Sequence, residues 1–388
     1  MKILHFILGR ASLQTSNGVN KVINGLCKYC AREGNEVVVV GLSKSSKERF
    51  HIVQRDGFQV EVFNSFWNNC YKRLKEIITH VDIVHLHSIN NNYNVVVANY
   101  LIKIGKPYVM TAHSGLCDDR FRHSGFLLKR IYHEMFQRRI YSKCSGIHAI
   151  TREEITAISK YATNENIFFV SNGLDLEFPE IEDISILKLP RSNKVNDEIH
   201  CGYLGRLSAE KNIGGLIKAI SILPEIYRHR LKCYFIGPDN TNEAKQLKQL
   251  TKELNLSNQI IFKGSLYGDD KYRMLKKLDF YIHPAFSDVV SIAVKEAMYC
   301  QLPSVITRTS DVAYYYNTDA FVMTEPEAKE LSKGIIEMID REMEWTIMGD
   351  NARSLVENTF NWAIVAPKMI KHYQELLNNE KTPSVLHT

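Results

Sequence analysis

Short apolar runs alternate with longer amphipathic stretches in the first 170 residues of the chain. Seven of these runs have the length and the β-branched and aromatic content of strands; they lie at residues 2–8, 36–41, 59–63, 82–87, 107–113, 146–150 and 167–170. Strands that are apolar at nearly every position are typical of a parallel sheet covered by helices on both faces. The pattern therefore predicts an α/β domain at residues 1–178.

A second region repeats this pattern after an interruption. Residues 179–197 are charged, contain proline and follow neither a helical nor a strand period, which indicates a linker. Six further strand-like runs follow at residues 200–204, 233–237, 259–262, 280–283, 303–307 and 320–322. We therefore predict a second parallel-sheet domain at residues 198–360. Residues 361–388 are expected to form a helix that crosses back to the first domain and ends in a loose tail.

Composition agrees with two globular domains in a reducing compartment. The chain has 388 residues, more than one hydrophobic core usually supports, with 45% hydrophobic and 24% charged residues. No apolar run approaches the roughly 18 residues of a membrane-spanning helix, and the N-terminal run is too short for a secretory signal. The eight cysteines are scattered, and Cys27 and Cys30 lack the second pair that a zinc site needs. We expect a cytoplasmic protein.

The net charge of +6 is concentrated in the N-terminal half, where residues 1–180 hold 23 Lys and Arg against 16 Asp and Glu. This excess points to an anionic partner such as a phospholipid surface or a lipid pyrophosphate, although a modest charge also serves solubility. Residues 126–143 form an amphipathic segment with basic residues off its apolar stripe. Two placements are compatible with it: contact with the inner face of an anionic membrane, or ordinary packing on the sheet.

Two motifs carry candidate chemistry. The first is G-R-L-S-A-E-K-N at residues 205–212, which lies between a strand and a helix. Arg206 and Lys211 would stand near a helix N-terminus, where free amides also favour anions, and together they could clamp a pyrophosphate. Two basic residues at such a position are also common on an ordinary solvated surface.

The second motif spans residues 283–298, where a strand, a loop and a helix follow one another. Asp288 would lie in the loop and Glu296 two turns along the helix, and a carboxylate can hold a ribose diol through paired hydrogen bonds. The amides of the first helical turn, at Ser291, Ile292 and Ala293, could hold a phosphate. Taken alone, two acids eight residues apart are explained equally well by a surface helix.

Taken together, the two motifs resemble the hallmarks of the retaining glycosyltransferase family 4, which has the GT-B fold of two Rossmann-like domains facing across a cleft. Its G-R-L-x-x-E-K-N segment is matched closely, and its later E-x7-E segment is matched by the E-A-M at residues 296–298. Asp288 replaces the first glutamate, while Val289 and Ser291 replace two glycines. Other ordered similarities are N-G-V at residues 17–19, D-I-V-H-L-H at 82–87, T-A-H at 111–113, V-S-N-G-L-D at 170–175 and the closing helix from 361.

The resemblance implies roles for single residues. Arg206 and Lys211 would neutralise the leaving diphosphate in place of a metal, and no D-x-D metal motif stands in the sequence. Glu296 would bind the ribose and Asp288 the hydroxyls of the donor sugar. Besides these residues the site would contain Gly18, whose missing side chain would let the N-terminal loop approach the phosphates, and His113, a contact to the donor sugar. A histidine at a strand end is otherwise often structural.

We therefore expect a retaining glycosyltransferase that needs no metal or other cofactor, with catalytic residues Asp288, His113, Arg206 and Lys211. The donor would be a nucleotide sugar, UDP-linked in preference to GDP-linked. The acceptor would be a glycan or a polyprenyl-pyrophosphate-linked glycan in bacterial O-antigen, capsule or exopolysaccharide synthesis, and no nucleic acid partner is expected. Three alternatives remain: a nucleotide-sugar epimerase of the same fold, a non-catalytic nucleotide-sugar-binding scaffold, and a two-lobed periplasmic sugar-binding protein, which the missing signal peptide disfavours.

Overall fold

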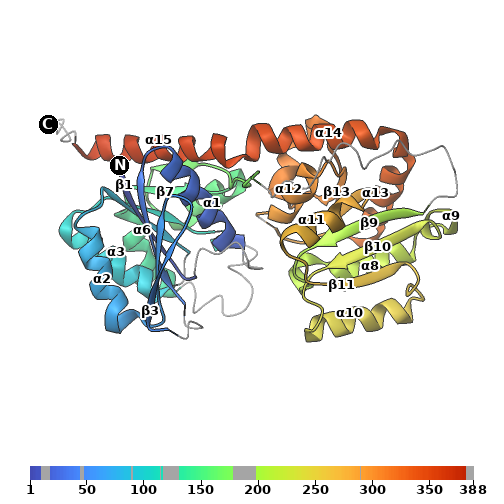
Figure 1. Cartoon of the computed structure of the whole chain (residues 1–388), viewed down its shortest axis with the longest axis horizontal. Coiled ribbons are helices and arrows are strands. Elements are labelled where there is room, and N and C mark those ends of the chain that lie inside the picture. Colours follow the sequence, from blue (N-terminus) through green and yellow to red (C-terminus); the bar gives the residue numbers. More distant parts are fainter. Residues whose placement is uncertain are drawn as a thin grey trace. The chain divides into compact units, whose positions relative to one another are not determined.

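The computed structural model describes residues 1–9, 18–43, 48–88, 91–113, 115–116, 131–177, 198–288 and 290–381. The chain divides into two compact units, Met1–Gly173 with Trp362–Thr388, and Leu174–Asn361. Each unit is built on its own sheet, as Figure 1 shows. The expected linker at residues 179–197 lies outside the described residues, and the C-terminal helix is part of the first unit.

The first unit contains an eight-stranded sheet with the order β3-β4-β2-β1-β5-β6-β7-β8. Its strands are β1 (Lys2–Ile7), β2 (Glu36–Leu42), β3 (Phe50–Gln54), β4 (Gln59–Phe63), β5 (Ile83–His87), β6 (Tyr108–Thr111), β7 (Gly146–Ala149) and β8 (Ile167–Phe169). All neighbours are parallel except β3 and β4, which pair antiparallel. Strand β3 was not predicted: it is an edge strand whose residues alternate between exposed and half-buried, so it lacks a continuous apolar run.

Helices cover both faces of this sheet. They are α1 (Gly18–Arg32), α2 (Tyr71–Ile78), α3 (Asn92–Ile104), α6 (Arg138–Ser142), α7 (Arg152–Tyr161) and α15 (Trp362–Lys381), with single π-helical turns η1 (Phe66–Cys70) and η2 (His133–Gln137). Local chemistry sets their ends: the Asn91 side chain accepts from Tyr93 N–H at the start of α3, and Gly105 with φ 65° ends it. Helices α2, α3, α6 and α7 contribute to one apolar core with the sheet.

The second unit contains a six-stranded parallel sheet with the order β11-β10-β9-β12-β13-β14. Its strands are β9 (Ile199–Leu204), β10 (Leu231–Ile236), β11 (Ile260–Gly264), β12 (Phe280–His283), β13 (Ser304–Thr307) and β14 (Phe321–Thr324). Its α-helices are α8 (Ile213–Ser221), α9 (Glu225–Arg228), α10 (Asn242–Glu253), α11 (Gly268–Lys276), α12 (Ile292–Tyr299), α13 (Ala328–Asp340) and α14 (Trp345–Leu355). The predicted α/β class with two parallel sheets is confirmed.

The strand order of the second unit reverses between β9 and β12, which are neighbours although they are far apart in sequence. In doubly wound sheets, ligands bind outside the carboxyl ends of the strands at such a switch point. The G-R-L-S-A-E-K-N motif begins directly after β9, and the second motif begins at the last residue of β12. The topology therefore brings both motifs to one edge of one sheet.

Candidate functional site

The loop after β9 has a conformation that requires glycine. Gly205 has φ 152°, and a Cβ atom placed on Gly237 of the neighbouring strand end would collide with the Gly205 carbonyl oxygen. Asn212, at the end of the motif, is buried and has a left-handed backbone with φ 54°. Its side-chain amide donates to Pro284 O at 2.9 Å and to Pro326 O at 2.7 Å. Asn212 therefore ties the first motif to the loop that carries the second.

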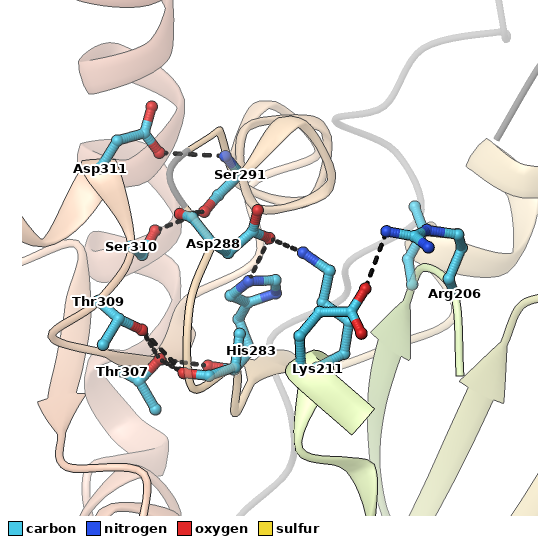
Figure 2. Close-up of polar contacts among 12 residues, drawn as sticks. Arg206, Lys211, His283, Asp288, Ser291, Thr307, Thr309, Ser310 and Asp311 are labelled. Carbon is cyan, nitrogen blue, oxygen red and sulfur yellow. Dashed lines mark hydrogen bonds and ion pairs between the residues drawn. The ribbon is translucent and has the colours of Figure 1, made fainter. Parts of the chain in front are cut away.

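Asp288 is the centre of a buried charged cluster (Figure 2). Its Oδ2 lies 2.6 Å from Lys211 Nζ and 2.8 Å from His283 Nε2. Burial raises the pKa of Asp288, but the hydrogen bond and charge of His283 and the charge of Lys211 outweigh this effect, so the pKa lies well below its usual range. The carboxylate is therefore ionised at neutral pH, and the structure brings together Lys211 and Asp288 as one pair.

Arg206 stands at the exposed side of this cluster. Its guanidinium donates to Glu210 Oε1 at 2.9 Å, and 56% of its side chain is exposed. The pair is solvated and contributes little to stability, so the guanidinium can exchange its partner for a ligand at little cost. Arg206 and Lys211 give the edge of the sheet two positive charges, one exposed to solvent and one held by Asp288.

The amides of the first turn of α12 are hydrogen-bonded within the protein. The Ser291 N–H donates to Asp311 Oδ1 at 3.2 Å, and the Ile292 N–H donates to Val290 O at 3.0 Å. A phosphate at these two amides would replace these bonds, and its binding there stays a prediction. Ala293 follows in the same turn, and Val289 lies outside the described residues.

Glu296 is buried on α12, on the side of the neighbouring helix α11. Lys271 Nζ donates to Glu296 Oε1 at 2.9 Å and to the Tyr272 hydroxyl at 3.0 Å. This lysine was not singled out from the sequence, because nothing in its local pattern separates it from the other lysines of an amphipathic helix. The buried Glu296 carboxylate is thus paired with a buried lysine.

The first unit carries the other two predicted site residues. Gly18 begins α1, and a Cβ added to it would meet no atom within 4 Å, so nothing described around this position requires glycine. His113 follows β6 with φ 48°, a strained conformation for a residue other than glycine, and its Nε2 lies 3.1 Å from His87 Nδ1. Burial lowers the pKa of His113 to about 3, so its ring is neutral at physiological pH.

Further histidines lie beside His113 on this sheet. His5, His85 and His87 have ring nitrogens within 4.8 Å of one another, a spacing that can hold a metal ion. Both nitrogens of His85 are already hydrogen-bonded, to Thr111 Oγ1 and to the Tyr373 hydroxyl, each at 2.6 Å. His5 and His87 share a hydrogen bond of 2.9 Å. His87 Nδ1 in turn contacts His113, so every ring nitrogen of these three histidines except His5 Nε2 has a protein partner, which does not fit a metal centre.

Comparison with known proteins identifies the family. Residues 187–355 match the model of the glycosyl transferases group 1, and residues 16–178 match that of Glycosyltransferase Family 4. An uncharacterized glycosyltransferase of Methanocaldococcus jannaschii, MJ1069, is 24% identical over 255 residues, which are 65% of this chain and 64% of that protein. The lipopolysaccharide glucosyltransferase WaaG of Escherichia coli is 28% identical over 124 residues, 31% of each chain. The chain thus spans less than two thirds of the length of either relative.

Solved structures agree at the level of the fold. HepE of Anabaena, solved in complex with UDP, superposes with a TM-score of 0.73 and 17% identity, covering 97% of this chain and all (100%) of that one. The two family models match most of both units, and the similarity of the fold extends over nearly the whole chain. The chain belongs to the family 4, group 1 glycosyltransferases of the GT-B fold.

Proposed function

We propose that this protein is a retaining glycosyltransferase that moves a hexose from a nucleotide diphosphate donor to an acceptor without a metal ion. The observation that carries the proposal is the Lys211–Asp288 pair at the switch point of the second sheet, with Arg206 at its edge. A cation and an ionised carboxylate side by side match the two halves of a nucleotide sugar, the anionic diphosphate and the hydroxyl-rich hexose.

The pair suits charge development during transfer. A lysine ammonium has three donors, so Lys211 can keep its bond to Asp288 while it donates to an oxygen of the leaving diphosphate. The second charge, from Arg206, can leave Glu210 for the other phosphate. A cation fixed in place before the reaction, as Lys211 is by Asp288, stabilises a leaving group without reorganisation, which is the task that a metal ion performs in other transferases. Asp288 and Glu296, both acceptors, would hold hydroxyls of the sugar and the ribose.

The finer assignments follow from the chemistry of relatives and remain proposals. HepE was solved with UDP and also with UDP-glucose, which supports a UDP-sugar over a GDP-sugar as the donor. The name of WaaG supports an acceptor in bacterial surface polysaccharide, either a glycan or a polyprenyl-pyrophosphate-linked glycan. We further propose His113 as a contact to the donor sugar, since a neutral imidazole offers one hydrogen-bond donor to a hydroxyl oxygen.

Contact with an anionic membrane would bring a lipid-linked acceptor to the enzyme. In the described part of the amphipathic segment, Ile140 is buried in the core, whereas Ile131, Met135 and Phe136 are exposed. Arg138 next to them is also exposed. This pattern of exposure supports the proposal that one edge of the segment packs on the sheet while the other contacts lipid. The described residues contain no helix that is long and apolar enough to span a bilayer.

A nucleotide screen with one matched pair of variants tests the proposal. We expect UDP and UDP-sugars to raise the melting temperature of the wild type and of Lys218→Ala, an exposed lysine on α8, but not of Lys211→Ala. The wild type should also release UDP slowly from the donor in water, with the same rate in EDTA. An epimerase would change the sugar without releasing UDP, and a scaffold would bind without either reaction. The absence of a thermal shift with any nucleotide would contradict the proposed glycosyltransferase function.

A further inference from the structure

One face of the first sheet carries a row of buried polar side chains among its apolar residues. In β5, Val84 and Leu86 belong to the core, so the alternate residues His85 and His87 point to the opposite face. Register extends the row, since His5 of β1 pairs with His85, Thr111 of β6 pairs with His87, and His148 of β7 pairs with Thr111. All of them are at least 96% buried, with exposed fractions between 0% and 4%.

Three of the histidines form a continuous chain of hydrogen bonds. His5 Nδ1 lies 2.9 Å from His87 Nε2, and His87 Nδ1 lies 3.1 Å from His113 Nε2. His113 is the end of the chain that lies outside the strands, at the loop after β6. The other end is His5 Nε2, which is buried and has no hydrogen-bond partner among the described residues.

Each imidazole ring in this series of hydrogen bonds carries only one proton. Burial lowers the pKa of His5 to about 3, burial with neighbouring histidines lowers that of His87 well below its usual value, and His113 is also neutral. A neutral imidazole has one donor and one acceptor, so all three rings must donate in the same direction. The tautomer of one ring therefore fixes the tautomer of the next.

The unpartnered His5 Nε2 determines in which direction the three rings donate their hydrogen bonds. If donation ran from His113 through His87 to His5, then His5 Nε2 would carry a buried N–H without an acceptor. In the opposite direction His5 Nδ1–H donates to His87, His87 Nδ1–H donates to His113, and His5 Nε2 keeps only a lone pair. Buried N–H groups without acceptors are rarer in proteins than acceptors without donors.

We propose that His5 and His87 are positioning residues that hold His113 in the tautomer with its proton on Nδ1 and its Nε2 occupied by His87. His113 then presents a single N–H donor and no free acceptor. The use of this donor for a sugar hydroxyl rests on the proposed function, whereas the tautomer itself does not. His87 and His5 touch no substrate in this scheme and act only through His113.

The tautomer can be measured directly by 15N NMR on protein labelled with 15N-histidine, where long-range couplings distinguish protonated from unprotonated ring nitrogens. His113→Gln assigns the signals of His113 by their loss. We expect wild-type His113 to be protonated at Nδ1 and unprotonated at Nε2. Protonation at Nε2 in the wild type overturns the proposal, and this measurement needs no variant at a buried strand position.

A pair of variants at His5 tests the coupling. His5→Leu removes the donor to His87 and should give a mixture of His113 tautomers, while His5→Asn keeps an N–H near the position of Nδ1 and should restore the single tautomer. A single Nδ1–H tautomer that persists in a folded His5→Leu variant shows that His5 fills space only and overturns the coupling. One equivalent of bound zinc or copper in the wild type, lost in His5→Leu, also overturns it, because metal ligation would occupy the lone pairs.

Kinetics separate this inference from the proposed function. With a UDP-sugar donor, His5→Leu should lower kcat/KM about tenfold, the value of roughly one hydrogen bond, and His5→Asn should recover most of it. If the tautomer shifts but kcat/KM does not, the positioning of His113 stands and its proposed contact to the sugar fails. If no donor is turned over at all, the proposed function fails while the NMR result still decides the tautomer.

Discussion

The predicted site residues of the two units lie among different kinds of buried polar groups. The second unit buries charges in pairs, Lys211 with Asp288 and Lys271 with Glu296, on the loops and helices around its switch point. The first unit buries neutral rings in series, from His5 to His113. A buried charge pair is stable only with both partners present and is suited to a charged ligand, whereas a neutral chain is suited to orienting an uncharged one. The contrast fits the proposed roles of Lys211, which would neutralise the diphosphate, and of His113, which would contact an uncharged hydroxyl.

The largest effect should come from breaking a charge pair in the second unit. Lys271→Met leaves the Glu296 carboxylate buried without that cation, and we expect the free energy of unfolding to fall by about 3–5 kcal/mol. The double variant Lys271→Met with Glu296→Gln should recover most of the lost free energy of unfolding, because neither residue of this pair is then charged. Urea unfolding of the single and double variants measures both quantities.

The exposed pair Lys333–Glu330 provides the control, with 62% of the lysine side chain exposed. Lys333→Met should change the unfolding free energy by no more than about 1 kcal/mol. If Lys271→Met is no worse than Lys333→Met, the Lys271–Glu296 pair does not carry the buried charge that distinguishes the second unit.

The next largest effect concerns catalysis. Lys211→Ala removes a cation aimed at the leaving diphosphate, and we expect kcat with a UDP-sugar to fall about 10²–10³-fold, as for other fixed groups that stabilise developing charge. His113→Ala in the first unit should cost about tenfold, because it removes one neutral hydrogen bond. Steady-state kinetics compare the two. Equal losses would remove the distinction between the charged contact of Lys211 and the neutral contact of His113.

Acid should weaken the two units at different pH. The pKa of His5 is lowered from an unfolded value near ~6.5 to about 3, so the unfolded chain binds one more proton between these values, and stability is lost as the pH falls through this window. The slope is about 1.4 kcal/mol per pH unit for each such histidine. Asp288, whose pKa is also lowered, keeps its contribution until the pH falls below about 4, the unfolded value, and loses it toward the still lower folded pKa.

Urea unfolding between pH 7 and pH 4 measures this slope, and hydrogen exchange assigns it to a unit. A folded His5→Leu variant should show a slope smaller by about 1.4 kcal/mol per pH unit. Protection factors in β1 and β5 should fall before those in β9 and β12. Earlier loss of protection in β9 and β12 would contradict the assignment of acid sensitivity to the histidine row.

The sequence predicted the architecture because buried parallel strands have a local pattern, a continuous apolar run, and β2 with its four consecutive valines is a plain case. It missed β3, an edge strand whose alternation is weak. It identified Lys211 and Asp288 through motifs, but their direct contact depends on the adjacency of β9 and β12, which no local pattern encodes. The hydrogen bond from the Ser291 amide to Asp311 was not predicted for the same reason, because only the folded structure brings these two loops together.

The sequence contained an indication of the buried histidines of the first sheet that the sequence analysis did not use. The alternation V-H-L-H in β5 places two histidines on one face, and a sheet face needs partners for such rings. Those partners, His5 and Tyr373, come from opposite ends of the chain, and only the register of β1 and the placement of α15 bring them together. Polar residues at alternate positions of a buried strand therefore predict a hydrogen-bond network. Which residues belong to the network can be identified only from the three-dimensional structure.

The smallest expected effect tests the role that the sequence assigned to Gly18. Its Cβ position is open, so Gly18→Ala should leave the affinity for UDP unchanged and raise the unfolding free energy by about 0.5–1 kcal/mol, through the lower entropy of the unfolded chain. Gly25→Ala on the same helix is the contrast, because its Cβ would collide with the Trp362 ring of α15 and should cost about 1–3 kcal/mol. Thermal unfolding and UDP titration of both variants decide the matter. A clear loss of UDP affinity in Gly18→Ala would instead support the role that the family resemblance gives to Gly18, a close approach to the phosphates of the donor.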